Sequence, residues 1–131
     1  MIHTISVPLY IELPRKTMAP KRYHLNLNVY RNLHYQVNNN LKKAYKKIVE
    51  PMLKGTCFST PLKLTLVLYP PDKRRRDRSN VLVVQEKFFM DALVELGHIP
   101  DDNDNYVVST TYLSGEVDKE NPRVDIIIEE I

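Results

Sequence analysis

The chain has 131 residues, 43% hydrophobic and 27% charged, which is enough for one domain with a buried core. No apolar run approaches the ~20 residues that a membrane-spanning helix needs, and the N-terminus lacks the basic start and cleavage site of a secretory signal. The single cysteine, Cys57, excludes an internal disulfide framework and a cysteine-based zinc cluster. We therefore expect one domain over residues 1–131, in the reducing cytoplasm and not in a membrane, with Cys57 as a small buried hydrophobe.

The net charge of +3 is unevenly distributed along the chain. Residues 1–100 carry 17 Lys and Arg against 7 Asp and Glu, whereas residues 101–131 carry 2 against 9. The first part therefore has a charge of +10 and the second a charge of −7. A basic body suits a polyanionic partner, because neutralised phosphates release their condensed counterions.

The first third of the chain changes its pattern twice. The β-rich segment from Ile2 to Leu13 predicts a first strand. Residues 14–32 are basic and contain two prolines and several asparagines, which predicts a loop or an irregular hairpin.

The next segment has helical periodicity. Its apolar residues at positions 37, 41, 44, 45, 48 and 52 predict a helix that Gly55 stops and that Pro51 kinks or ends near Glu50. Four lysines occupy the other faces of this helix, either as a solvated surface or as a DNA contact. They are Lys42, Lys43, Lys46 and Lys47.

The second half of the chain alternates strands with one helix. Leucines alternate from residue 62 to residue 68 and predict a strand. A helix over Asn80–Leu96 follows, with Ser79 or Asn80 as its N-cap and Gly97 at its end. Two further strands cover residues 105–115 and 122–131. The order predicts a single α/β domain, a mixed sheet of about four to five strands with two main helices.

A basic run lies between the leucine-rich strand and the second helix. The stretch "PDKRRRDRSN" places five basic side chains around one aspartate, Asp77. Like charges repel one another, so this cluster indicates an anionic partner such as DNA. The basic side chains are Lys73, Arg74, Arg75, Arg76 and Arg78.

Carboxylates flank the second helix. Asp77 precedes it and Asp102 follows it in a "DDND" turn, while Lys87 and Asp91 are i,i+4 neighbours on one of its faces. A helix of about 17 residues is ~25 Å long, so Asp77 and Asp102 meet only if the strand ends return the turn towards the middle of the helix.

Such a group of oxygen ligands suits Mg²⁺ or Mn²⁺, and a nearby lysine can stabilise charge on a phosphoryl oxygen. If the site forms, Asp77, Asp102 and Asp91 are expected within ~5–8 Å of one another. Two simpler interpretations stay open. The "DDND" turn can be turn chemistry alone, and Lys87 with Asp91 can be a surface ion pair.

The combined pattern "RRRDRSN…K…DAL…G.IPDDN" resembles the RusA family of Holliday junction resolvases, a group common in phages and prophages. The resemblance covers about residues 25–131 and is strongest from Pro70 to Asn105. On the N-terminal side it is looser, where "NLNVYRN" is similar to the family's segment of asparagine and aromatic residues.

This resemblance implies a RusA-like fold and a Mg²⁺-dependent endonuclease that resolves four-way junctions or other branched DNA in recombination and repair. It implies a homodimer, since two symmetric cuts need two sites related by a dyad, and it implies no small-molecule cofactor. The metal-binding aspartates fall on Asp77 and Asp102, the catalytic lysine falls on Lys87, and Asn28 matches the family's asparagine at the DNA-binding side.

Two departures from the family pattern bear on catalysis. Ser79 stands where the family has a second metal-binding aspartate, and four extra residues precede Lys87, which is close to one helical turn. Asp91, Asp101 or Asp104 replaces the missing carboxylate, or one metal is held more weakly, or activity is reduced. The alternative function is a non-catalytic dimeric DNA-binding protein derived from a resolvase. An RNA-binding regulator is a third, although the sequence has no aromatic stacking motif of an RNA-recognition module.

Overall fold

The computed structural model describes residues 2–56 and 58–131, and the expectation for Cys57 lies outside the described residues. The elements along the chain are β1 (Ile2–Val7), β2 (Tyr10–Leu13), β3 (Lys21–His24), α1 (Leu27–Asn32), α2 (Tyr35–Leu53), β4 (Leu62–Tyr69), α3 (Arg78–Glu95), β5 (Val107–Ser114) and β6 (Arg123–Glu130). None of the helices in this part of the chain combines the length and the apolar character that a bilayer crossing requires.

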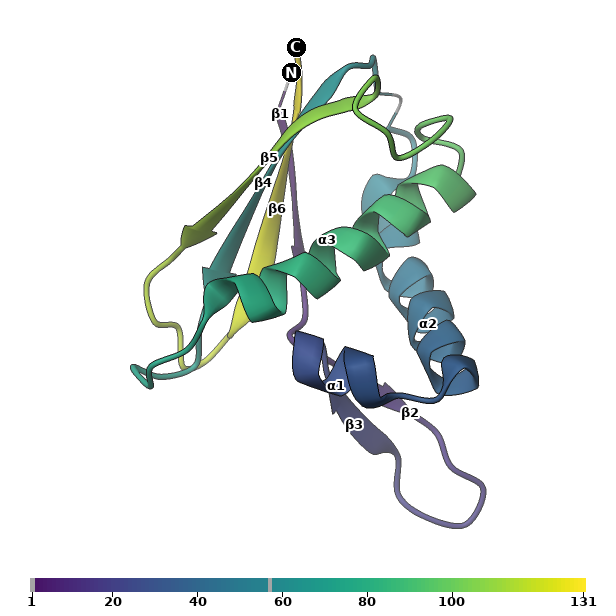
Figure 1. Cartoon of the computed structure of the whole chain (residues 1–131), viewed down its shortest axis with the longest axis vertical. Helices are drawn as coiled ribbons and strands as arrows, with labels where there is room; N and C mark the ends of the chain where they lie inside the picture. Colours follow the sequence, from purple (N-terminus) through teal and green to yellow (C-terminus); the bar gives the residue numbers. More distant parts are fainter. Residues whose placement is uncertain (1, 57) are drawn as a thin grey trace.

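A four-stranded mixed sheet forms one side of the molecule, with the strand order β1-β6-β4-β5. β5 runs parallel to β4, whereas β6 is antiparallel to both β4 and β1. α3 crosses one face of this sheet, with α2 beside it, and the start of β1 and the end of β6 lie together at one end of the sheet (Figure 1). The alternating leucines of β4 are at most 3% exposed. The predicted α/β class, the mixed sheet and the two main helices are confirmed.

The N-terminal segment differs from the prediction. The single strand expected over residues 2–13 is two strands, because β1 joins the main sheet and β2 pairs with β3 in a separate hairpin. Pro8 lies between them and has no N–H to continue a ladder. Residues 14–32 contain β3 and the helix α1, whose N-cap Asn26 accepts a hydrogen bond from the backbone N–H of Val29 at 2.9 Å.

α2 continues past Glu50 to Leu53, so Pro51 does not end it, which was one of the two effects expected of this proline. Pro51 lies inside its last turn, and its side chain is exposed. Water can therefore reach the carbonyl of Lys47 that the missing N–H would have bonded. Gly55, with a φ of +78°, follows the helix as predicted, since a glycine adopts this left-handed conformation without a steric penalty.

A buried polar chain joins the two long helices to the corner between β1 and β2. The hydroxyl of Tyr45 on α2 donates to Oε1 of Gln85 on α3 at 3.0 Å, and Nε2 of Gln85 donates to the carbonyl of Pro8 at 2.9 Å. Both side chains are fully buried. Burial raises the pKa of Tyr45. The position of α3 over the sheet is therefore specified by hydrogen bonds as well as by apolar packing.

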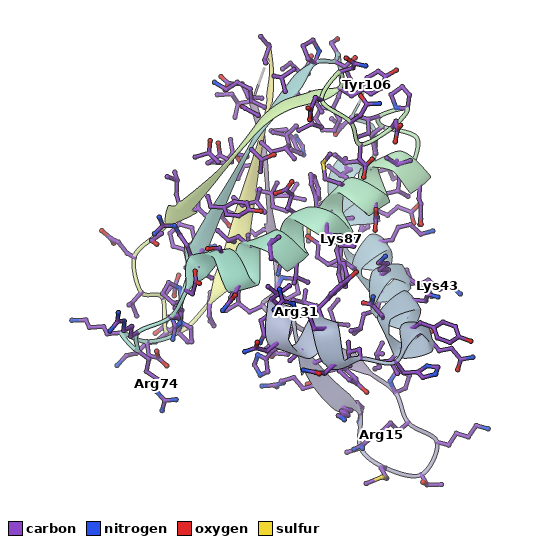
Figure 2. All side chains as sticks on the ribbon, viewed as in Figure 1. Arg15, Arg31, Lys43, Arg74, Lys87 and Tyr106 are labelled. Carbon is purple, nitrogen blue, oxygen red and sulfur yellow. The ribbon has the colours of Figure 1, made fainter. Side chains whose placement is uncertain are left out.

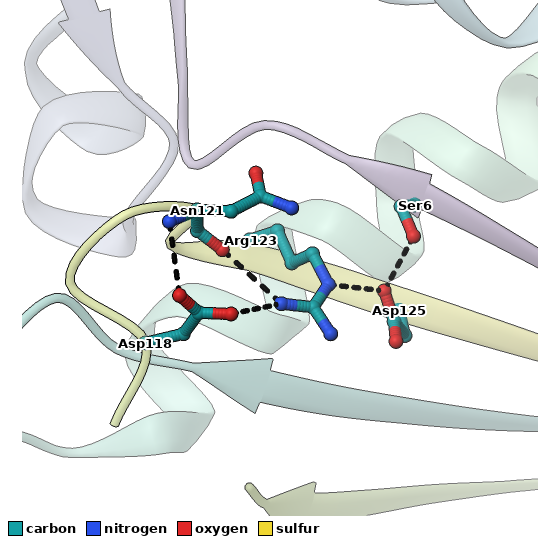
Figure 3. Close-up of polar contacts among 5 residues, drawn as sticks. All are labelled: Ser6, Asp118, Asn121, Arg123 and Asp125. Carbon is teal, nitrogen blue, oxygen red and sulfur yellow. Dashed lines mark hydrogen bonds and ion pairs between the residues drawn. The ribbon is translucent and has the colours of Figure 1, made fainter. Parts of the chain in front are cut away.

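Two carboxylates of the acidic C-terminal segment are neutralised locally. The guanidinium of Arg123 donates to Asp118 at 2.8 Å and to Asp125 at 3.0 Å (Figure 3). Asp125 also accepts from the hydroxyl of Ser6 on β1, and Asp118 accepts from the backbone N–H of Asn121. These contacts tie β1, β6 and the loop before β6 together, so part of the acidic charge has a structural role.

Candidate nucleic-acid interface

The basic run forms the loop between the carboxyl end of β4 and α3. Its residues Lys73, Arg74 and Arg75 are exposed. Figure 2 shows the side chain of Arg74 at an outer corner of the molecule, beyond the ends of the strands. A run of basic residues is therefore exposed to solvent at one end of the sheet. We define Asp72 to Arg78 as the basic loop.

Arg76 and Arg78 are also exposed, but both donate hydrogen bonds within the protein, and Arg74 forms an ion pair with Asp72 at 3.9 Å. Arg76 donates to the carboxylate and to the backbone carbonyl of Asp72, and Arg78 donates to Oγ of Ser114 at 3.1 Å. The carboxylate of Asp72 also accepts from the backbone N–H of Arg74 at 3.0 Å. The pKa of Asp72 is lowered, mainly by this hydrogen bond from the backbone of Arg74 and further by the hydrogen bond and positive charge of Arg76. Asp72 thus organises the loop.

Asp77 is the N-cap of α3. Its Oδ1 accepts hydrogen bonds from the hydroxyl of Ser79 at 2.8 Å and from the backbone N–H of Ser79 at 3.0 Å. These two bonds, the hydroxyl first, lower the pKa of Asp77. The prediction that Ser79 or Asn80 caps the helix is wrong, because the carboxylate of Asp77 reaches the orphan N–H two residues later.

Asp102 lies in the turn that follows α3. Its backbone N–H donates to Oδ1 of Asp101 at 2.8 Å, and Nδ2 of Asn103 donates to the other oxygen of Asp101 at 3.2 Å. These bonds lower the pKa of Asp101, and the bond from the backbone N–H of Asp102 has the largest effect. The carboxylate of Asp101 therefore forms the local hydrogen bonds that are typical of a turn.

The lysine and the aspartate expected as a pair on α3 do not pair in the structure. Lys87 is exposed near the middle of the helix (Figure 2). Asp91 instead forms an ion pair with Lys42 of α2 at 3.3 Å, and a second pair joins Lys46 to Glu95 at 3.1 Å. Two of the four α2 lysines thus hold α2 against α3, which neither sequence interpretation anticipated.

Asp77, Asp91 and Asp102 do not come together within one chain. α3 has 18 residues and is about 27 Å long at 1.5 Å per residue. Asp77 lies before its first residue and Asp102 lies beyond its last. Figure 2 places Arg74 and Tyr106, which lie near these two aspartates in the sequence, at opposite ends of the four-stranded sheet. Within residues 2–56 and 58–131, no group of three or more His, Asp or Glu side chains could hold a metal ion. A divalent ion bound by all three aspartates does not fit a single chain.

The remaining predicted residue, Asn28, is exposed on α1. Its carbonyl accepts from Nδ2 of Asn32 at 2.8 Å. Three residues near the basic loop were not predicted from the sequence, because only folding brings them there. They are Tyr10, Arg22 and His24. With Arg76 they line a cavity of about 380 Å³ between the β2–β3 hairpin and the start of α3.

No protein-family model matches the chain, and no curated protein matches it either. The resemblance to RusA resolvases therefore stays a prediction from the sequence motif.

Proposed function

We propose that this protein binds branched DNA, four-way junctions in particular, through the basic loop. The observation that carries the proposal is the exposure of Lys73, Arg74 and Arg75 at one end of the sheet. The charge of +10 over residues 1–100 supports it, because a basic body attracts a polyanion from a distance and each neutralised phosphate releases counterions. A DNA partner also agrees with the cytoplasmic location expected from the sequence.

We further propose that the protein is a Mg²⁺- or Mn²⁺-dependent endonuclease whose sites form between two copies of the chain. The edge strand β5 supports this dimer. It has eight residues and no charged residue or proline, and its outer edge has no partner strand among the described residues. Val108 and Leu113 on this strand are 46% and 47% exposed. An edge without protecting charges is a template for pairing with a second chain.

Antiparallel pairing of two β5 strands would also bring the separated carboxylates together. A dyad at Thr111, which sets this residue opposite its own copy, places Ser114 opposite the partner's Val108. Asp77 lies near Ser114, because the adjacent Arg78 bonds that side chain, and the turn with Asp102 leads into Val107. Asp77 would thus lie at the same end as the partner's Asp102, twice per dimer. A divalent ion held there would stabilise charge on a phosphodiester.

The first test compares a synthetic four-way junction with a linear duplex of the same length, in the presence of Mg²⁺. We expect tighter binding and cleavage of the junction. Asp77→Asn should abolish cleavage but leave binding intact or tighter, because it removes a negative charge near phosphate. Equal, weak binding of both DNAs would contradict the proposal.

The second test asks whether the sites are shared between chains. Asp77→Asn and Asp102→Asn should each be inactive alone. A mixed dimer keeps one intact site, made of Asp77 from one chain and Asp102 from the other, so mixing the variants should restore nicking of one strand. If both carboxylates acted within one chain, the mixture would stay inactive.

The second candidate function, a non-catalytic DNA-binding protein, is favoured by one observation. The carboxylate of Asp77 and the hydroxyl of Ser79 are both used in capping α3. Tight junction binding without cleavage in Mg²⁺ or Mn²⁺ would establish this alternative.

A further inference from the structure

A preformed hollow lies beside the basic loop, at the meeting point of the β2–β3 hairpin, the end of β4 and the first turn of α3. Its volume is about 380 Å³, within the range of sites that hold small planar ligands. Leu25 and Leu68, which are 2% and 3% exposed, belong to its lining, together with Val81 and Pro71. The interior is therefore apolar and suits a flat, weakly hydrated group.

The rim of the hollow is cationic and aromatic. The guanidinium of Arg22 lies 3.8 Å from the centre of the Tyr10 ring. The rings of His24 and Tyr10 form an edge-type contact, with 5.8 Å between their centres. Arg76 also lines the hollow, and its guanidinium is held by the carboxylate of Asp72. Glu12 pairs with Arg22 at 3.2 Å. Both arginines are thus positioned before any ligand arrives.

These features together select a particular ligand. An apolar ligand such as a lipid chain would need no cations at the rim, and an acidic side chain would leave the apolar interior empty. A nucleotide satisfies both parts, because its base has apolar faces that stack on tyrosine, histidine and arginine planes while its phosphate is anionic. Arg76 belongs to both the hollow and the basic loop, so the two sites are continuous.

We propose that the hollow takes one unpaired base of a branched DNA, while the phosphates of the same strand lie along Lys73, Arg74 and Arg75. This inference rests on the proposed DNA binding and adds a reason for its structural preference. A base stacked within a duplex must be extruded before it enters such a pocket, whereas an unpaired base at a branch point enters with little unstacking. The hollow would therefore favour branched DNA that exposes an unpaired base over a continuous duplex.

The test uses two DNA probes of equal length and charge density, a continuous duplex and the same duplex with one unpaired 2-aminopurine, whose fluorescence reports stacking. The wild-type protein should bind the second probe roughly 5- to 150-fold more tightly, the range that stacking of one base supplies. Its fluorescence should change as the protein saturates it.

Two variants and one matched control locate the effect. Val81→Phe fills the hollow and Arg22→Ala removes the stacked plane at its rim, so each should reduce the preference for the unpaired base while duplex affinity changes little. Val83→Phe makes the same substitution on α3 at a residue that is 39% exposed and should keep the preference. Melting temperatures of all variants identify any loss of folding, and Arg22→Ala, half exposed, decides the result if Val81→Phe is unstable.

The outcomes separate this inference from the proposed function. If the wild-type protein binds neither probe, the DNA-binding proposal fails. If it binds both equally, or if Val81→Phe and Arg22→Ala keep the preference, DNA binding stands but the hollow is not a base site.

Discussion

The hydroxyl of Ser79 donates to Oδ1 of Asp77 at 2.8 Å, and the backbone N–H of Ser79 donates to the same oxygen at 3.0 Å. The residue that departs from the resolvase pattern therefore supports the aspartate that agrees with it. This relationship gives Asp77 a structural role at the start of α3, which must be separated from any role in catalysis.

Replacing the cap should lower stability in a graded order. Asp77→Ala removes the acceptor for the first turn of α3 and should lower the melting temperature. Asp77→Asn should stay close to the wild type, because asparagine caps about as well as aspartate. Ser79→Ala keeps the hydrogen bond from the backbone N–H, so its melting temperature should lie between those of Asp77→Ala and Asp77→Asn. Circular dichroism melting checks this order, and an unchanged Asp77→Ala protein would contradict the capping role.

The cap should also weaken in acid. Because hydrogen bonds from Ser79 lower the pKa of Asp77 below its ordinary 3.8, the charged carboxylate stabilises the folded state above that value. The contribution is lost as the pH falls through the lowered pKa. The difference in unfolding free energy between the wild type and Asp77→Ala, which has no capping side chain, should therefore shrink as the pH falls from neutral through this range. A constant difference at all pH values would exclude this linkage.

Removing the exposed arginines of the basic loop should weaken DNA binding and its salt dependence. Arg74→Ala with Arg75→Ala should lower the slope of log affinity against log salt by ~0.9 for each phosphate that the protein no longer neutralises. Lys43→Ala with Lys47→Ala on α2 is the matched control and should leave the slope unchanged. The reverse pattern would move the DNA interface to α2.

The buried hydrogen bond between Tyr45 and Gln85 can be measured by a single-atom deletion. Tyr45→Phe leaves Oε1 of Gln85 without its donor in a fully buried position, which should cost about 1–3 kcal/mol of unfolding free energy. Tyr35→Phe, at a residue that is 67% exposed, should change stability by less than about 0.5 kcal/mol. Equal effects in urea denaturation would contradict a special role for the buried bond.

The proposed dimer edge can be blocked with a charge. Thr111→Lys places two lysines side by side at the proposed dyad, where like charges repel. Sedimentation should show a monomer, and junction cleavage should fall while thermal stability of the monomer persists. Thr4→Lys, on the edge strand β1 at the other side of the sheet, is the control and should remain dimeric. Dissociation by Thr4→Lys alone would place the interface at β1.

Local patterns in the sequence determined the class of the fold. Alternating leucines predicted β4, and helical spacing predicted α2 and most of α3, because a strand or an amphipathic helix must repeat its apolar positions every two or every 3.6 residues to bury one face. Gly55 and Gly97 marked the ends of both helices correctly, with φ angles of +78° and +81°. The first strand was predicted as one element because its apolar residues continue through Pro8, and composition alone does not show to which sheet a strand belongs.

The basic loop and its exposed cations also followed from the sequence, since a run of like charges cannot be buried. The partners of the individual side chains did not, because ion pairs such as Lys42 with Asp91 join residues that only packing brings together. The same reason governs the site. Asp77 and Asp102 belong to one sequence motif, yet the length of α3 separates them in the folded chain. The hollow beside Arg76 is lined by residues from separate segments of the chain, which no local sequence pattern relates.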